Sequence, residues 1–174
     1  MMRVHRLIVD GYNVIHSDPR YKALASQDLD AARTRLVEEV GAFAFGDSRA
    51  VVVFDGGANP SSDGTPHHVA GVTVIFSPSG ESADSVVEAL ARRSRDREER
   101  VTVVTSDAAT QWTVFAGEVS RMSSAEFSRR LVETGGDWQE HAPAGSVRGI
   151  LEERIKADVR TTLSRWARGE GSRP

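Results

Sequence analysis

The sequence predicts an α/β protein, a three-layer α/β/α sandwich around a central and mainly parallel sheet. Four short runs rich in valine and isoleucine have the length of buried strands, and longer segments with helical periodicity separate them. An acidic residue follows each run. The chain has 174 residues, of which 39% are hydrophobic, enough for one well-formed core.

The first half of the chain contains two of these runs. We expect a strand over Arg6–Asp10, a turn at Gly11–Asn13 and a loop from Asp18 onward. A helix is predicted from near Asp28 to Phe45, because apolar residues recur there at helical spacing. A second strand is predicted over Ala50–Phe54.

The second half begins with a stretch rich in Gly, Pro, Ser and His over residues 56–71, which we expect to be a long structureless loop. The elements predicted after it are, in order, a strand over Val72–Phe76, a helix over Glu81–Arg95, a strand over Val101–Thr105, a helix over Asp107–Phe115, a short strand over Glu118–Arg121 and a helix over Ser123–Glu133. Ser123 followed by Glu126 has the spacing of a helix-capping box.

The last part of the chain is predicted to be a linker and a helix. The linker covers Gly135–Gly145, and the helix covers Val147–Arg168 with few apolar residues. We therefore divide the chain into a main domain, residues 1–145, and a C-terminal helix, residues 146–174, that packs on or extends the same domain.

Composition excludes several classes of protein. The absence of cysteine excludes disulfides and thiolate metal sites, and the net charge of −3 argues against a generally basic nucleic-acid binder. No apolar run is long enough for a membrane span or a signal peptide, so we expect a cytoplasmic protein with no membrane partner. No phosphate-binding P-loop or dinucleotide-binding glycine motif is present.

Carboxylates follow the predicted strands at the ends that meet at one edge of a parallel sheet. They are Asp10, Asp55, Glu81, Asp84 and Asp107. Such carboxylates repel one another unless a cation lies between them, and oxygen ligands suit Mg²⁺ or Mn²⁺. Each acid alone has a simpler interpretation as a turn residue or a helix cap. Their coincidence at four strand ends favours a divalent-metal site.

Polar side chains beside these acids extend the predicted site. Asn13 is placed to bind a carboxylate, a metal-bound water or a phosphate, and Ser106 carries a hydroxyl next to Asp107. Asp55 is equally compatible with a position outside the immediate shell of the metal.

Arginines supply 20 of the 22 cations, and their planar guanidinium suits phosphate contact. We expect a phosphodiester backbone to contact Arg92, Arg93, Arg129 and Arg130. A solvated helix surface with internal ion pairs is an equally good explanation of these clusters.

Four blocks of sequence together resemble the YacP-like NYN domain family of the PIN-like nuclease superfamily. They are Leu-Ile-Val-Asp-Gly-Tyr-Asn-Val-Ile at 7–15, Val-Val-Val-Phe-Asp-Gly-Gly at 51–57, Val-Ile-Phe-Ser-Pro-Ser-Gly-Glu-Ser-Ala-Asp at 74–84, and Val-Val-Thr-Ser-Asp at 103–107 followed by Gln111-Trp112. The resemblance implies a PIN-like (NYN) fold and metal-dependent RNA cleavage. By position it implies Asp10, Asp84 and Asp107 as the acids that hold the metal, with Asn13 as the polar residue of the first motif. Glu81 lies beside Asp84 in the same block.

The resemblance also implies a biological setting, since some relatives are ribosome-associated endoribonucleases in messenger RNA decay. We therefore expect a Mg²⁺- or Mn²⁺-dependent endoribonuclease whose partner is RNA, including mRNA on the ribosome. Two alternatives stay open: a DNA or structure-specific nuclease with the same site, and a non-catalytic RNA- or ribosome-binding module. The non-basic loop at residues 56–71 leaves the path of the RNA undefined.

Overall fold

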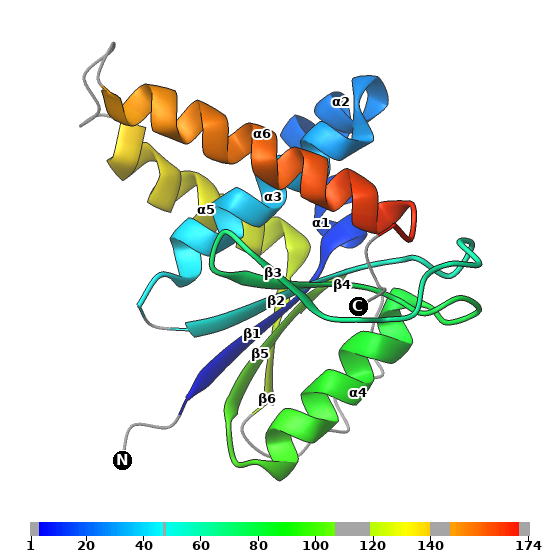
Figure 1. The fold of residues 1–174 in the computed structure, drawn as a ribbon. Coiled ribbons are helices and arrows are strands. Elements are labelled where there is room, and N and C mark those ends of the chain that lie inside the picture. The colour runs from blue at the N-terminus through cyan, green and yellow to red at the C-terminus, as the bar shows by residue number, and fades with distance from the viewer. Residues whose placement is uncertain (1–3, 47, 107–118, 140–146, 171–174) are drawn as a thin grey trace.

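The computed structural model describes residues 4–46, 48–106, 119–139 and 147–170. Its centre is a six-stranded sheet with the order β3-β4-β2-β1-β5-β6 (Figure 1). The strands are β1 (His5–Asp10), β2 (Ser48–Phe54), β3 (His67–Val69), β4 (Val72–Phe76), β5 (Arg100–Thr105) and β6 (Val119–Ser123). Every neighbouring pair is parallel except β3 and β4. The predicted fold class is confirmed.

Helices cover both faces of the sheet, as in a three-layer sandwich (Figure 1). They are α1 (Gly11–Ser17), α2 (Pro19–Gln27), α3 (Leu29–Ala44), α4 (Ala83–Asp96), α5 (Ser124–Gln139) and α6 (Val147–Ala167). In the described part of the chain α4 lies alone on one face, and the other five helices lie on the opposite face.

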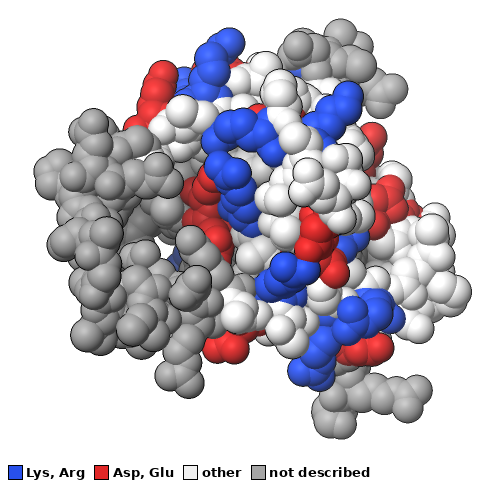
Figure 2. Space-filling view, turned by 90° about the horizontal axis from the view of Figure 1, so that it is seen from above, with Lys and Arg blue, Asp and Glu red and all other residues white. Residues whose placement is uncertain are grey.

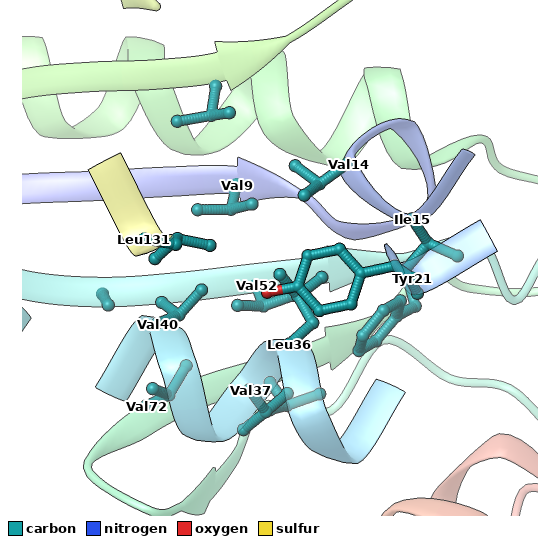
Figure 3. Close-up of a cluster of buried hydrophobic side chains, with 14 of the residues drawn as sticks. Val9, Val14, Ile15, Tyr21, Leu36, Val37, Val40, Val52, Val72 and Leu131 are labelled. Carbon is teal, nitrogen blue, oxygen red and sulfur yellow. The ribbon is translucent and has the colours of Figure 1, made fainter. Parts of the chain in front are cut away.

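Two apolar clusters, one on each face of the sheet, form the core. Alternate strand residues face alternate sides, so Val9 and Val52 belong to the cluster under α3, while Ile8 and Val51 belong to the cluster under α4. Figure 3 shows the larger cluster, in which the buried ring of Tyr21 lies among aliphatic side chains. Because these strands are buried on both faces, their sequences are continuous apolar runs.

Helices α1 and α2 replace the turn and loop that the sequence predicted after β1. Asp18 caps α2, because its carboxylate accepts the N–H of Arg20 at 2.8 Å, and Pro19 occupies the first helical position. An Asp-Pro pair is therefore a helix start here, which is a position where proline fits well.

The predicted loop over residues 56–71 contains strand β3, so the prediction that it lacks structure is wrong. Ala70 and Gly71 both have positive φ, 52° and 75°, and form the two-residue turn of a hairpin between β3 and β4. Ala-Gly is an uncommon sequence for such a turn, which hides the hairpin from a sequence analysis.

Helix α5 continues through Gly135 and Gly136 to Gln139, where the sequence predicted a linker. Glycine weakens a helix that has already formed without ending it. Its start agrees with the prediction, since Ser123 Oγ accepts the N–H of Glu126 at 3.1 Å. The predicted helix over 107–115 and the rest of the linker lie outside the described residues.

Helix α6 packs on α3 through Val159 and Leu163, which are buried in the larger core cluster. Arg160 and Ser164 donate hydrogen bonds to Asp28 and Asp30 at the start of α3. Within the described ranges, none of the helices has the length and apolar character needed to cross a membrane.

Candidate functional site

The strand order of the sheet reverses at β1. The chain passes from β1 to β2 and β4 on one side, and then returns to β5 on the other side of β1. In parallel sheets, ligands bind at the crevice created by such a reversal of strand order. Asp10 is the last residue of β1.

Asp10 is buried, with 4% of its surface exposed, and it caps helix α1. Its carboxylate accepts the backbone N–H of Asn13 at 3.4 Å and the Asn13 side-chain amide at 2.6 Å. Asn13 thus holds the Asp10 carboxylate in one orientation, and a carboxylate was one of the three partners that the sequence analysis left open for it.

Burial raises the pKa of Asp10 to about 6 from its ordinary value of 3.8. The two hydrogen bonds from Asn13 lower this pKa, while the neighbouring carboxylate of Asp84 raises it. Asp10 and Asp84, which follow different strands in the sequence, therefore lie close together at the carboxyl edge of the sheet. A divalent cation between them would offset their repulsion.

Asp84 is an exposed residue in the first turn of α4. Ser82 caps this helix, since its hydroxyl accepts the N–H of Ser85 at 3.2 Å. Glu81 consequently precedes the cap, and the prediction that Glu81 and Asp84 share one helical face is wrong. The backbone carbonyl of Glu81 accepts a hydrogen bond from Ser77 Oγ at 2.9 Å.

Asp55 follows β2 and lies on a different side of the site. Its Oδ1 accepts the N–H of Gly57 at 2.8 Å, and its charge raises the pKa of Tyr12. Tyr12, Arg33 and Asp55 line a common cavity. The structure brings Asp55 to Tyr12, whereas it brings Asp84 to Asp10.

Strand β5 ends beside Asp10. Val104 is level with Val9, so Thr105 and Ser106 emerge next to the carboxyl end of β1. The Ser106 carbonyl accepts a hydrogen bond from Arg121 at 2.6 Å. Asp107, predicted as a metal ligand, lies outside the described residues.

The described residues contain no group of three or more acids or histidines that could hold a metal ion. They do contain the Asp10–Asp84 pair and the Asn13 amide. The oxygen ligands of this pair and the burial of Asp10 fit a hard divalent cation. Further ligands would come from water, the substrate or the chain beyond Ser106.

The predicted RNA-binding arginines lie away from this pair. Arg92 and Arg93 lie about 12–14 Å farther along α4 than Asp84, at 1.5 Å per residue. Arg92 pairs with Glu88 and Arg130 with Glu126, both at 2.8 Å. Arg93 and Arg129 are exposed and have no ion-pair partner in the described part of the chain. In Figure 2, cations and acids alternate over the face that is shown.

The sequence analysis missed Arg33 and its hydrogen bonds to Tyr12. Arg33 Nε and Nη2 donate to the Tyr12 hydroxyl at 2.9 and 2.5 Å. The signal was present, because Arg33 stands four residues after Leu29 and three before Leu36, within the apolar spacing of α3. A charged residue at such a position indicates a buried polar contact.

The mainly parallel sheet with helices on both faces and acids at its carboxyl edge is consistent with the PIN-like class of α/β folds. The chain also matches the YacP-like NYN domain over residues 7–168. It is 31% identical to the protein YacP of Bacillus subtilis (strain 168), with 94% of this chain and 97% of that protein covered.

Two solved structures are similar to this chain over nearly its whole length. The crystal structure of Rae1 (YacP) from Bacillus subtilis has a TM-score of 0.63 at 29% identity, covering 97% of this chain and 96% of the other. The crystal structure of a mutant of the same Bacillus subtilis protein has a TM-score of 0.62 at 28% identity, covering 95% and 96%. The protein described here therefore belongs to the YacP-like NYN domain family.

Proposed function

We propose that the protein is a divalent-metal-dependent endoribonuclease that hydrolyses RNA phosphodiester bonds at the carboxyl edge of the sheet. The observation that carries the proposal is the buried carboxylate of Asp10 beside Asp84. A folded protein retains such a pair at a cost in stability, and functional sites are where this cost is usually found.

Asp10 and Asp84 would hold Mg²⁺ or Mn²⁺, with Asp107 and Glu81 as further candidates from the sequence. A cation held there supplies an activated water and neutralises charge on the phosphate. Asn13 keeps the Asp10 carboxylate oriented through its two hydrogen bonds. Asp10 must be deprotonated to act as a ligand, so its raised pKa makes metal binding fall below about pH 6.

RNA is the substrate that the family membership favours, and the arginines on α4 and α5 would contact its backbone. Because water is the proposed nucleophile, the products should carry 5′-phosphate and 3′-hydroxyl ends. A 2′,3′-cyclic phosphate would instead indicate attack by the ribose hydroxyl and would contradict this mechanism.

The test is cleavage of an end-labelled single-stranded RNA with Mg²⁺, Mn²⁺ or EDTA, together with a matched single-stranded DNA. Metal-dependent cleavage of RNA in preference to DNA is the expected result. Preferential cutting of DNA would favour a DNA nuclease. If free RNA is not cut, the same assay on translating ribosomes separates a partner-dependent enzyme, which cuts there, from a binding module, which does not.

A further inference from the structure

We infer that the cavity between Tyr12, Arg33 and Asp55 binds one nucleoside of the RNA, the one adjoining the cleaved phosphate, and that Asp55 contacts its base. The inference rests on the proposed function. It assigns Asp55 to the substrate, where the sequence analysis left open a role at the metal.

The cavity has a volume of about 480 Å³ and opens beside the first turn of α1. Such a volume falls within the usual range of small-molecule sites. Its walls come from segments far apart in the chain: α1, α3, the segment that follows β2, the end of β4 and the end of α6. In Figure 1 the red end of α6 lies on the same side of the molecule as the start of α4.

Arg33 and the aromatic rings of Tyr12 and Phe76 lie together in the wall of the cavity. The side chain of Arg33 is only 12% exposed, and its Nη1 donates to Asp30 at 2.5 Å. Its guanidinium carbon lies 5.5 Å from the ring centre of Tyr12 and 5.8 Å from that of Phe76. Planar guanidinium groups and aromatic rings are the surfaces on which unpaired RNA bases stack.

Tyr12 offers a hydrogen-bond donor to the cavity. Its oxygen accepts both bonds from Arg33, so its own proton has no acceptor among the residues that the structure describes. The Tyr12 hydroxyl can therefore donate this proton to a ligand in the cavity.

Asp55 offers an acceptor. Its Oδ1 accepts the N–H of Gly57, and its Oδ2 has no partner in the described ranges. Guanine presents two adjacent N–H donors at its Watson–Crick edge, which a carboxylate can accept together. Uracil presents a single N–H between two carbonyl oxygens, which a carboxylate repels. Guanosine is therefore the nucleoside that matches this cavity best.

The charge of the lining favours a base over a phosphate. Arg33 is paired with Asp30, and Arg168 is paired with Glu170 at 3.4 Å. The carboxylate of Asp55 remains without a cationic partner among the described residues. An anionic phosphate would meet this charge directly, whereas a neutral base with N–H donors would be attracted to it.

The cavity also lies at a suitable distance from the Asp10–Asp84 pair. Val53 of β2 is level with Asp10, and Asp55 comes two residues later. At about 4.8 Å between strands and 3.3 Å per residue, the backbones of Asp10 and Asp55 are separated by roughly 8 Å. This is within the reach of a single nucleotide whose phosphate lies at Asp10.

Helix α6 closes one side of this cavity with Ala167 and Arg168. Asn59 fixes this wall, since its amide donates to the Ala167 carbonyl at 2.8 Å. Trp166 also holds this end of α6 in place, because its ring stacks on that of His67 with the ring centres 4.1 Å apart. The C-terminal helix thereby becomes part of the substrate site.

The test is to titrate the metal-free protein with guanosine, adenosine, cytidine and uridine in turn and to monitor binding by NMR. We expect guanosine to bind most tightly and uridine most weakly, and Asp55→Ala to weaken guanosine binding about tenfold. As a matched control, Asp96→Asn removes an exposed acid from the far end of α4 and should leave this binding unchanged.

Two results would overturn the inference: absence of saturable nucleoside binding, or guanosine binding that Asp55→Ala does not change. Because nucleosides lack a scissile bond and the titration contains no metal, it is independent of cleavage. A protein that binds guanosine through Asp55 but cuts no RNA would refute the proposed function and leave the nucleoside site standing.

Discussion

The carboxylate of Asp10 is buried at the end of β1 with a second acid, Asp84, as its neighbour. Burial penalises the charged form of Asp10, and the hydrogen bonds from Asn13 offset only part of this penalty. The metal-free protein therefore carries an unfavourable charge at neutral pH. A bound cation would relieve this repulsion, so stability and metal binding are coupled at this residue.

The stability of the metal-free protein should depend on pH, because folding raises the pKa of Asp10. The pKa of Asp10 is about 6 in the folded protein and near 3.8 when unfolded, so the folded state binds more protons between these values. The metal-free protein should therefore lose stability as the pH rises from about 4 to about 6. A pKa difference of about two corresponds to about 3 kcal/mol.

Asp10→Asn should consequently stabilise the metal-free protein by about 2 kcal/mol at pH 7.5 and have little effect at pH 4. Asparagine keeps the shape of Asp10 without its charge, and its amide oxygen can still accept one of the two hydrogen bonds from Asn13. Urea unfolding in EDTA at the two pH values measures this difference, with Asp96→Asn as control. An Asp10→Asn protein that is less stable than the wild type at pH 7.5 would refute this electrostatic account.

At the residue scale, the sequence predicted that strand ends bring acids together, and the structure places Asp84 beside Asp10. The role of these residues in holding a metal stays a prediction. Arg33 was missed because a cation on an apolar helix face becomes informative only when its partner, Tyr12, is known. The prediction that Glu81 lies in the helix was wrong, because Ser82 is the N-cap of α4 and the helix begins at Ala83.

At the scale of elements, strands were easier to predict than the connections between them. All four long apolar runs became strands, since burial on both faces makes such runs continuous. Helices α1 and α2 were missed because their stabilisation is tertiary, through Ile15 and Tyr21 in the core, while their local sequence resembles a loop.

Helix α6 illustrates the same dependence on packing. Its sequence has few apolar residues, yet Val159 and Leu163 reach the core shared by α3 and α5. The sequence alone left open whether this helix packs on the domain or extends from it. The structure places its described part on α3 and gives its end a place in the wall of the nucleoside cavity.

Leu163→Ala should lower the free energy of unfolding by about 3 kcal/mol, because the side chain of Leu163 is fully buried and its loss leaves a cavity. Arg165→Ala, an exposed change two residues later, should alter it by less than about 0.5 kcal/mol. Thermal or urea unfolding compares the two. A change of less than about 0.5 kcal/mol for Leu163→Ala would contradict the packing of α6 on the core.

At the scale of the whole molecule, the fold gathers acids at one edge and distributes arginines over the helices. The net charge is −3, and several arginines are neutralised by acids one helical turn away. RNA affinity should therefore come from a few unpaired cations, which include Arg93 and Arg129 among the described residues, and not from a continuous basic surface.

Removing one such phosphate contact should change the salt dependence of RNA binding. For a single strand, the slope of log affinity against log salt changes by about 0.7 per contact. Arg93→Ala should reduce the slope by this amount, and Arg92→Ala, whose guanidinium pairs with Glu88, should reduce it less. Fluorescence anisotropy with labelled RNA at several salt concentrations measures both. Equal slopes in the wild type and Arg93→Ala would exclude α4 from the RNA path.

The most direct test of the proposed metal site is the rate of RNA cleavage in Mn²⁺ by the wild type, Asp84→Asn and Asp96→Asn. Asp84 is exposed, so its substitution should leave the fold intact. We predict that Asp84→Asn lowers the rate at least about 100-fold and that Asp96→Asn leaves it unchanged. An Asp84→Asn protein that cuts RNA at the wild-type rate would contradict the assignment of the site.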